Sequence, residues 1–288
     1  MAPTLLVPAM NDRMWAHPTV RRNTAAAEEI GYHVLDPDNG ALAVGEGSGP
    51  GRMPEPETIL AHCARLLEVP TALRGRRLVV TAGPTREPID PVRFLSNHSS
   101  GKMGVAIASA AWRRGAEVTL IAGPLDVAVP AGVHAVRVET TAQMRDAVER
   151  ALAGADALIM AAAPADFAAA APSIGKIKKA ELGDTIALTA TDDILVTTRG
   201  SRSSACVTVG FALETGDARS EARRKLADQS LDFIVANDAL EDGAGFAIDT
   251  NRVTIVHADG REESLPLQSK TQVADEILDR VEELLRGR

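Results

Sequence analysis

Apolar residues recur along the chain in two spacings that alternate. Short apolar runs typical of buried strands are separated by segments in which apolar residues recur every three or four positions, as on one face of a helix. The strand-like runs occupy residues 78–82, 117–121, 134–138, 156–162, 206–211 and 232–236. The helix-like segments occupy residues 103–114, 141–153, 193–199 and 217–229. This alternation predicts an α/β fold with a Rossmann-like, mostly parallel sheet and flanking helices.

The C-terminal segment follows a different pattern. Residues 252–257 and 261–267 flank an Asp259-Gly260 pair, which favours the tight turn of a β-hairpin. Residues 270–285 then have the spacing of an amphipathic helix. We therefore expect a C-terminal β-hairpin followed by a closing helix.

The N-terminal segment is less regular and does not make a convincing domain alone. It predicts short strands at 4–7 and 33–35, helices near 20–30 and 56–67, and a glycine-rich loop between them. Pro70, Gly75 and three arginines close to them indicate a boundary. The chain is therefore predicted to have two parts, residues 1–70 and 71–288.

Composition and charge agree with an ordinary soluble enzyme. The 288 residues are 45% hydrophobic, which supplies one large or two modest cores. Charged residues and a proline interrupt the longest apolar run, so neither a membrane span nor a signal peptide is predicted. The formal net charge of −8 argues against sequence-independent nucleic-acid binding. Cys63 and Cys206 lack metal-ligand spacing, which favours free thiols and a cytoplasmic protein.

The stretch NHSSGKMG at 97–104 follows the 78–82 strand and opens the next predicted helix. Ser99 or Ser100 is expected to cap this helix, and the two glycines allow a ligand or a neighbouring backbone to approach closely. Free amide groups at a helix start favour an anion. The spacing matches neither the Walker loop nor the Gly-x-Gly-x-x-Gly fingerprint. A phosphate-binding turn and a plain glycine-tolerant turn both remain open.

Longer motifs carry a resemblance to a known family. They are VTAGPTREPIDPVRFLSNHSSGKMG (80–104), AAAPADF (161–167), KIKK (176–179), VGFALET (209–215) and VANDA (235–239). In this order they resemble phosphopantothenate–cysteine ligase of coenzyme A biosynthesis, which bacteria usually carry fused behind a flavin-dependent phosphopantothenoylcysteine decarboxylase. PAMN (8–11) and GPGRM (49–53) resemble the last part of that decarboxylase. The resemblance makes residues 1–70 a remnant of the decarboxylase domain and residues 71–288 the ligase domain.

The resemblance implies a reaction in two steps. The carboxylate of (R)-4′-phosphopantothenate attacks the α-phosphate of CTP in the presence of Mg²⁺, which releases pyrophosphate and forms an acyl-cytidylate. The amine of cysteine then displaces the nucleotide monophosphate. Both steps depend on positioning and on stabilisation of developing charge.

The resemblance also implies which residues contact the nucleotide. The implied set is Met160, Ala161, Ala162, Asp166, Lys176, Asp192, Asp193, Ile194, Leu195, Phe211, Lys225 and Gln229. The family more commonly has proline at 192 and lysine at 229. From the residues alone, a helix N-cap is the alternative for Asp166 and a core residue the alternative for Phe211, while a lone helical lysine such as Lys225 is normally a surface residue.

Two residues are expected to carry the chemistry. Lys176 matches a lysine of the family that binds the nucleotide, although an anonymous Lys-x-Lys-Lys is usually a solvated loop. Asn97 matches the asparagine implicated in use of the acyl-nucleotide, and it is expected to contact the substrate together with Ala162. An amide can donate to a developing oxyanion without changing charge. Without the resemblance, Asn97 is equally a turn residue. The metal ligands are not predicted.

The decarboxylase activity of the family is not expected here. Asn11 matches the asparagine that orients the substrate carboxylate in the decarboxylase, but the best alignment places Val44 where the family often has a proton-donating cysteine. The flavin-binding half of that domain has no counterpart in the sequence, so FMN is not expected to bind this chain alone.

The remaining expectations concern partners and alternatives. The family's ligase domain is dimeric, and a homodimer would also cover the exposed edge of the hairpin. One alternative is a non-catalytic partner that completes or regulates a separate decarboxylase half. Another is a nicotinamide-dependent oxidoreductase on a Rossmann-like sheet, which the absent Gly-x-Gly-x-x-Gly disfavours.

Overall fold

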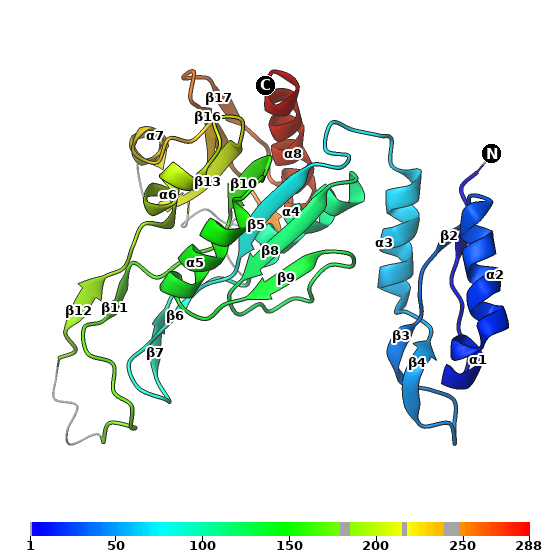
Figure 1. The fold of residues 1–288 in the computed structure, drawn as a ribbon. Coiled ribbons are helices and arrows are strands. Elements are labelled where there is room, and N and C mark those ends of the chain that lie inside the picture. Colours follow the sequence, from blue (N-terminus) through cyan, green and yellow to red (C-terminus); the bar gives the residue numbers. More distant parts are fainter. Residues whose placement is uncertain (1, 179–184, 215–217, 239–247) are drawn as a thin grey trace. The chain divides into compact units, whose positions relative to one another are not determined.

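The computed structural model describes residues 2–178, 185–214, 218–238 and 248–288. The chain divides into two compact units, Met1–Val69 and Pro70–Arg288 (Figure 1).

The second unit is built on an eight-stranded sheet (Figure 1). In spatial order, its strands are β17 (Glu262–Ser264), β16 (Thr254–His257), β14 (Phe233–Asp238), β13 (Val207–Glu214), β10 (Ala157–Met160), β5 (Arg77–Ala82), β8 (Glu117–Ala122) and β9 (His134–Arg137). The six strands from β14 to β9 are parallel, and β16 and β17 are antiparallel. The parallel strands follow the 3-2-1-4-5-6 order of a doubly wound sheet, which changes direction between β5 and β10.

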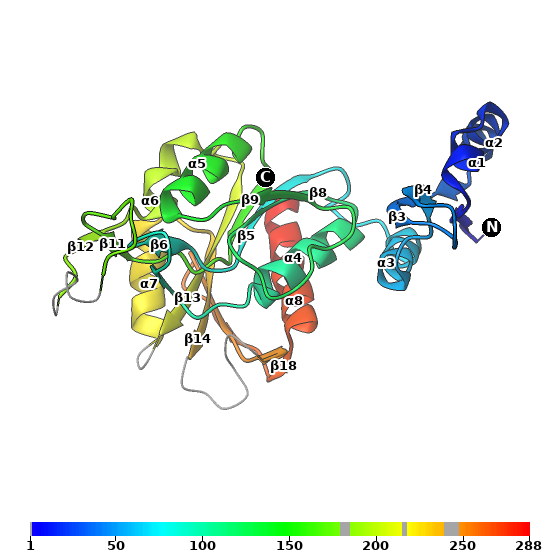
Figure 2. The same ribbon diagram turned by 90° about the horizontal axis from the view of Figure 1, so that it is seen from below.

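Helices cover both faces of this sheet (Figures 1 and 2). One face carries α4 (Lys102–Arg113) and α8 (Lys270–Arg286), and the other carries α5 (Thr141–Ala151), α6 (Ile194–Thr197) and α7 (Ala218–Asp228). Because both faces are covered, the central strands are apolar throughout, as in other parallel sheets. Val79, Val80, Leu158 and Ile159 are at most 2% exposed. The predicted α/β fold with a mostly parallel sheet and flanking helices is confirmed.

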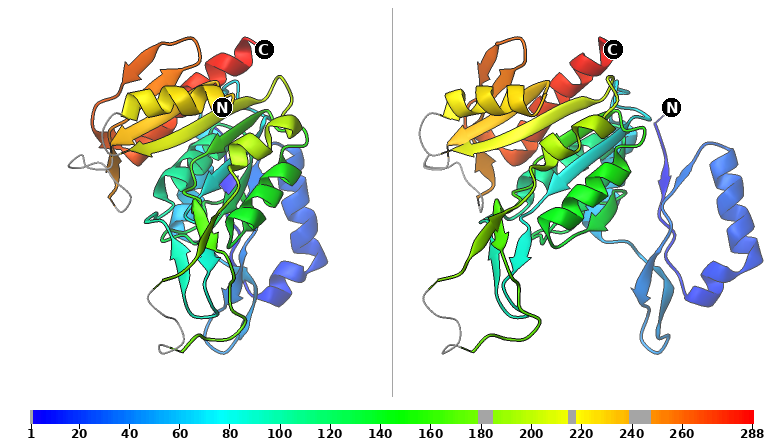
Figure 3. Two further views of the ribbon diagram at one scale, coloured as in Figure 1. Left: turned by 90° about the vertical axis from the view of Figure 1, so that its left-hand side faces the viewer. Right: turned by 60° about the vertical axis from the view of Figure 1, so that its left-hand side comes forward.

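Short hairpins project from the carboxyl ends of the strands and were not predicted. They are β6–β7 (Arg86–Pro88 and Phe94–Ser96) and β11–β12 (Phe167–Ala169 and Leu188–Ala190). Strand β11 lies against β6 and β7, so the two hairpins form one arm (Figure 3). A further two-stranded pair, β15 (Thr250–Asn251) with β18 (Gln268–Ser269), precedes α8.

The first unit consists of short elements. They are β1 (Leu5–Leu6), α1 (Asp12–Ala16), α2 (Pro18–Glu29), β2 (His33–Val34), β3 (Asp38–Ala41), β4 (Ser48–Arg52) and α3 (Pro56–Leu67). Strands β1 and β2 are parallel, and β3 and β4 form a hairpin within the segment expected to be a glycine-rich loop. Across the described ranges, no helix is long and apolar enough to cross a membrane.

Candidate active site

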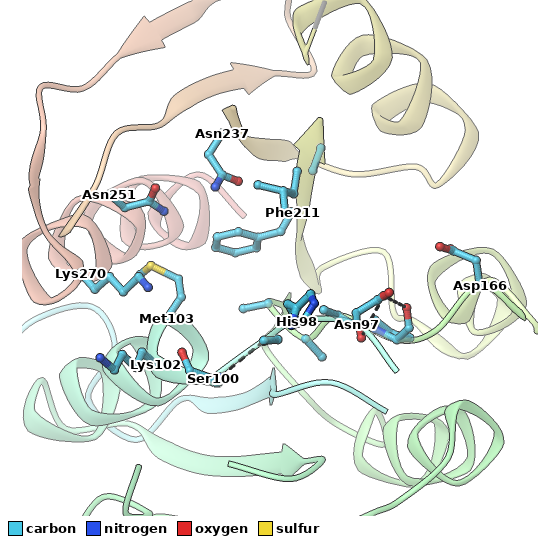
Figure 4. A pocket seen from close by; sticks show the side chains of 18 of the residues that line it. Asn97, His98, Ser100, Lys102, Met103, Asp166, Phe211, Asn237, Asn251 and Lys270 are labelled. Carbon is cyan, nitrogen blue, oxygen red and sulfur yellow. Dashed lines mark hydrogen bonds between the residues drawn. The ribbon is translucent and has the colours of Figure 1, made fainter. Parts of the chain in front are cut away.

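The main cavity lies beyond the carboxyl ends of the central strands, at the point where the strand order changes direction. Ligands bind at this position in open α/β sheets. The cavity has a volume of about 510 Å³ and is bounded by the 97–103 loop, the segment after β10 and the ends of β13 and β14 (Figure 4). Asn97 and His98 lie near Phe211, and Lys102, Lys270 and Asn251 lie at the opposite end (Figure 4).

Glycines shape the loop that enters α4. The N-cap of α4 is Gly101 in the left-handed region, with φ of 76°, and no side chain caps the helix. The expectation that Ser99 or Ser100 caps it is therefore wrong, because a left-handed cap favours glycine. A Cβ at Gly104 would lie 2.5 Å from the Thr81 carbonyl oxygen, so Gly104 lets α4 pack directly on β5. The predicted close approach is thus to a neighbouring backbone.

Hydrogen bonds join the two loops that form the floor of the cavity. The Ala162 amide donates to Thr81 Oγ1 (3.0 Å), and the Ala165 amide donates to Thr85 Oγ1 (2.9 Å). The Ala163 amide donates to the carbonyl of Gly83 (2.9 Å). The loop after β5 and the loop after β10 are therefore fixed to one another.

Asn97 connects the 97–103 loop to this floor. Its Nδ2 donates to the Pro164 carbonyl oxygen at 2.9 Å and lies 3.4 Å from that of Ala163. The side chain is exposed to the cavity. An amide nitrogen has two hydrogens, so Asn97 can keep its shorter bond to Pro164 and exchange the longer bond to Ala163 for one to a ligand.

A smaller cavity of about 250 Å³ adjoins the first. The two share wall residues, namely Ala162, Pro164, Asp166, Phe211 and Lys225. The smaller cavity also contains Met160, Asp192, Asp193, Ile194, Leu195 and Gln229. The structure thus brings together every residue of the implied nucleotide set except Ala161, which lines the larger cavity, and Lys176, which lines neither.

Charge is unevenly distributed over the two cavities. Lys102 and Lys270 line the larger one, Asp192 and Asp193 line the smaller one, and Lys225 lies where they meet. Lys270 is only 7% exposed, and burial, together with the charge of Lys102, lowers its pKa. Its Nζ donates to the Ile248 carbonyl at 2.7 Å. The larger cavity therefore suits a polyanion, and the smaller one suits a neutral polar group.

Comparisons with known proteins agree with this architecture. Residues 73–285 match the model of the DNA/pantothenate metabolism flavoprotein C-terminal domain, and residues 1–68 match the Flavoprotein model. The chain is 45% identical over 283 residues to the coenzyme A biosynthesis bifunctional protein CoaBC of Bacillus subtilis, with 97% of this chain and 69% of that protein covered. The chain belongs to the CoaBC family.

The chain is also similar to two further proteins. The crystal structure of a CoaBC C-terminal domain is 39% identical, with a TM-score of 0.64, and covers 76% of this chain and 100% of its own. A protein from an unknown prokaryotic organism, described as cysteine/cysteine sulfinic acid decarboxylase, is 40% identical over 97% of this chain and 79% of its own.

Side-chain contacts hold residues 192 and 229 in place. Gln229 Nε2 donates to Asp193 Oδ2 at 2.8 Å, and Asp193 Oδ1 accepts from the Val196 amide at 3.0 Å. Gln229 therefore holds the α6 cap in place. Asp192 pairs with Arg145 of α5.

Lys176 lies on the projecting arm. The neighbouring Ile177 is held by Asp90 and Arg93: its amide donates to Asp90 Oδ2 at 3.2 Å, and its carbonyl accepts from Arg93 Nη2 at 2.8 Å. Hydrogen bonds from Arg93 hold the pKa of Asp90 well below its usual range. Lys176 itself is exposed, and Lys179 of the same motif lies outside the described residues.

Three residues that line the larger cavity were not predicted as site residues, and one predicted substrate contact lies in the first unit. Lys270 and Asn251 line the larger cavity, but neither stands in a recognisable motif. Asn237, whose role the sequence leaves open, lines it as well. Asn11 lies in the first unit, where its Oδ1 caps α1 by accepting from the Arg13 amide at 2.9 Å.

Proposed function

We propose that this chain joins cysteine to 4′-phosphopantothenate with CTP, through an acyl-cytidylate formed where the two cavities meet. The observation that carries the proposal is the separation of charge between the cavities. The lysines of the larger cavity suit the triphosphate. The smaller cavity then receives the base and ribose, since its carboxylates would repel phosphate.

Phosphopantothenate is assigned to a third cavity, which lies on the side of Asn97 away from the nucleotide. A third cavity of about 430 Å³ shares the 97–100 segment with the main one and contains Arg86. A guanidinium suits the phosphate of phosphopantothenate. In this arrangement the substrate carboxylate passes Asn97 to reach the α-phosphate beside Lys225.

These side chains contribute to both steps of the reaction. Lys102, Lys225 and Lys270 stabilise the charge of the triphosphate and of the departing pyrophosphate. Attack of the carboxylate oxygen on the α-phosphorus breaks the bond to the bridging oxygen and gives the acyl-cytidylate. Asn97 then donates to the carbonyl oxygen while the cysteine amine attacks. CMP leaves, and the amine proton passes to solvent.

We propose that magnesium arrives with the nucleotide. Across those residues, no group of three His, Cys, Asp or Glu side chains could hold a metal ion. Mg²⁺ is commonly bound by substrate phosphates with one or two carboxylates, and Asp166 lines both cavities. When bound, the ion would neutralise phosphate charge.

The first unit does not fit FMN in the cavity beside α3. That cavity of about 470 Å³ is formed by Met53, Pro54, Glu55, Pro56, Ile59, Leu60 and Cys63. It has no cation for a flavin phosphate, so no step is assigned to flavin.

The decisive experiment is incubation of the purified chain with phosphopantothenate, cysteine, Mg²⁺ and either CTP or ATP. Pyrophosphate and phosphopantothenoylcysteine should form with CTP. Carbon dioxide release from cysteine or from phosphopantothenoylcysteine, without pyrophosphate, would instead support a decarboxylase. Absence of all these products would favour the non-catalytic partner.

Removal of residues 1–69 should leave ligation largely intact. All three cavities assigned to the reaction belong to Pro70–Arg288, and compact units of this kind commonly fold alone. We expect the fragment to keep most of the full-length kcat/KM. A fragment with native circular dichroism but no product would contradict the assignment.

The ligase unit should form a homodimer. Strand β17 ends the sheet with its outer edge unpaired in the described chain, and natural proteins usually cover such edges. Sedimentation at micromolar concentration should give the mass of at least two chains. A monomer under these conditions would count against the homodimer.

A further inference from the structure

His98 lies where the larger cavity and the third cavity meet. It follows Asn97 directly in the 97–103 loop, and it lines both cavities. Figure 4 shows His98 beside Asn97 and near Phe211. The side chain is exposed, and its ring makes no hydrogen bond to any described residue. An imidazole nitrogen is therefore available at the place where the acyl group and the α-phosphate are assigned to meet.

The second step of the proposed reaction has to remove protons from cysteine. At neutral pH the amino group of cysteine is largely an ammonium group, which has no lone pair for attack. Its nitrogen loses one proton to become a nucleophile and a second proton as the amide forms. The departing CMP leaves as a stable phosphate anion and needs no acid. The step therefore requires a base at the acyl carbon and no partner acid.

His98 is the side chain best suited to accept such a proton. The other charged side chains that line the three cavities are Arg86, Lys102, Asp126, Asp166, Asp192, Asp193, Lys225 and Lys270. Charged arginine and lysine are donors only, and carboxylates are weak bases at neutral pH. Among the described residues of these cavities, His98 is the only imidazole. Imidazole changes its charge between about pH 5 and 8, which suits a general base.

Lys270 is the other candidate for a base, because burial lowers its pKa. However, Lys270 lies at the opposite end of the larger cavity from Asn97 (Figure 4). Its Nζ also donates to the Ile248 carbonyl at 2.7 Å, which favours the charged form. The position beside Asn97 therefore favours His98.

We propose that His98 is the general base that receives the proton of the cysteine amine. The inference rests on the proposed function, because it requires the acyl-cytidylate to form beside Asn97. The lone pair freed on nitrogen forms the bond to the acyl carbon, and the bond from that carbon to the phosphate oxygen of CMP breaks. Because His98 is exposed, it passes the proton to solvent and is neutral again for the next turnover.

Replacement of His98 by glutamine removes the base and keeps a polar side chain. Attack by cysteine on preformed acyl-cytidylate should slow by about a hundredfold or more at pH 7, a usual effect of losing a general base. Pyrophosphate release without cysteine should stay near the wild-type rate, because attack of a carboxylate on phosphorus transfers no proton. Rapid-quench experiments with mass spectrometry measure the two steps separately.

The effect of pH has a definite direction. A protonated imidazole cannot accept a proton, so the wild-type rate of amine attack should fall as the pH drops through the range in which imidazole becomes charged. In His98→Gln, attack depends on cysteine that arrives already neutral. The difference between variant and wild type should therefore shrink as the pH rises. A change that only distorts the loop should slow attack by the same factor at every pH.

Two further comparisons separate a base from a structural residue. Free imidazole added to His98→Ala should restore part of the rate, in proportion to the neutral fraction of the added imidazole. Hydroxylamine is mostly neutral at pH 7, so its attack on the acyl-cytidylate should be slowed much less by His98→Gln than attack by cysteine. The matched control is His134→Gln, which changes an exposed imidazole of β9 that lines none of the three cavities. It should behave as the wild type.

The outcomes distinguish this inference from the proposed function. Product formed at the normal rate by His98→Gln would overturn the role of His98 and leave the ligase standing. Equal slowing at every pH and with hydroxylamine, or loss of pyrophosphate release in the variant, would also overturn that role. Failure of the wild-type chain to release pyrophosphate would instead overturn the proposed function, and the general base with it.

Discussion

Replacement of Lys176 by glutamine should abolish pyrophosphate release. The ammonium group is expected to follow the triphosphate through the activation step, and loss of one charge-stabilising group at a reacting centre typically slows the reaction by about a hundredfold or more. The measurement is pyrophosphate formed from CTP and phosphopantothenate without cysteine. Lys178→Gln, which removes the same charge two residues away, is the matched control and should retain most activity. Near-normal release by Lys176→Gln would remove Lys176 from the mechanism.

A second measurement tests whether Lys176 acts in the site of its own chain or in that of a partner. Lys176 lies on the arm and lines neither of the two cavities, so we expect it to reach the phosphates either within its own chain or in a partner's site. Mixing Lys176→Gln with Asn97→Asp chains distinguishes these arrangements. If the arm serves the partner's site, mixed dimers regain one intact site, and about a quarter of wild-type activity returns. If the arm serves its own chain, mixing restores nothing.

Asn97→Asp should separate the two steps of the reaction. The change replaces a neutral donor with an anion beside a carbonyl oxygen that gains negative charge. Loss of one such donor costs about 2.7–4 kcal/mol, so amine attack should slow by about a hundredfold or more. Pyrophosphate should still be released, and acyl-cytidylate should accumulate even with cysteine present, as detected by mass spectrometry.

Asn97→Asp would also remove a hydrogen bond that holds the loop in place. A carboxylate at this position could not donate to the Pro164 carbonyl, which Asn97 contacts at 2.9 Å, so the 97–103 loop would also lose an anchor. Asn97→Ala removes the donor without adding charge, and comparison of the two variants measures the contribution of repulsion. Normal turnover by Asn97→Asp would make Asn97 a turn residue, whereas failure to form the intermediate would move its role to the first step.

The sheet could be predicted from sequence because its strands are buried on both faces. A run such as 78–82 has to be apolar throughout, and the helices between such runs repeat their apolar residues at helical spacing. The arm could not be predicted in this way. Its strands are three residues long, too short for a period, and Asp90 and Arg93 stabilise it through contacts with a segment far along the chain.

Some residues of the candidate site could be predicted from the sequence and others could not. Residues in contiguous motifs, such as Asn97 and Asp166, could be nominated because the motif itself carries the resemblance. Lys270 and Asn251 could not be nominated in this way. Asn251 lies in β15 and Lys270 at the start of α8, and the antiparallel pairing of β15 with β18 brings these two segments together at the cavity. Such convergence is a property of tertiary structure and leaves no local pattern.

The paired loops that form the cavity floor affect the free energy of binding. The amides of Ala162, Ala163 and Ala165 are already bonded to the end of β5 and the segment after it, so the backbone there is ordered by folding itself. Ordering a loop on association normally reduces affinity. Here the entropic cost of ordering these loops is part of the stability of the fold, so it does not reduce the affinity for a ligand that binds in the cavity.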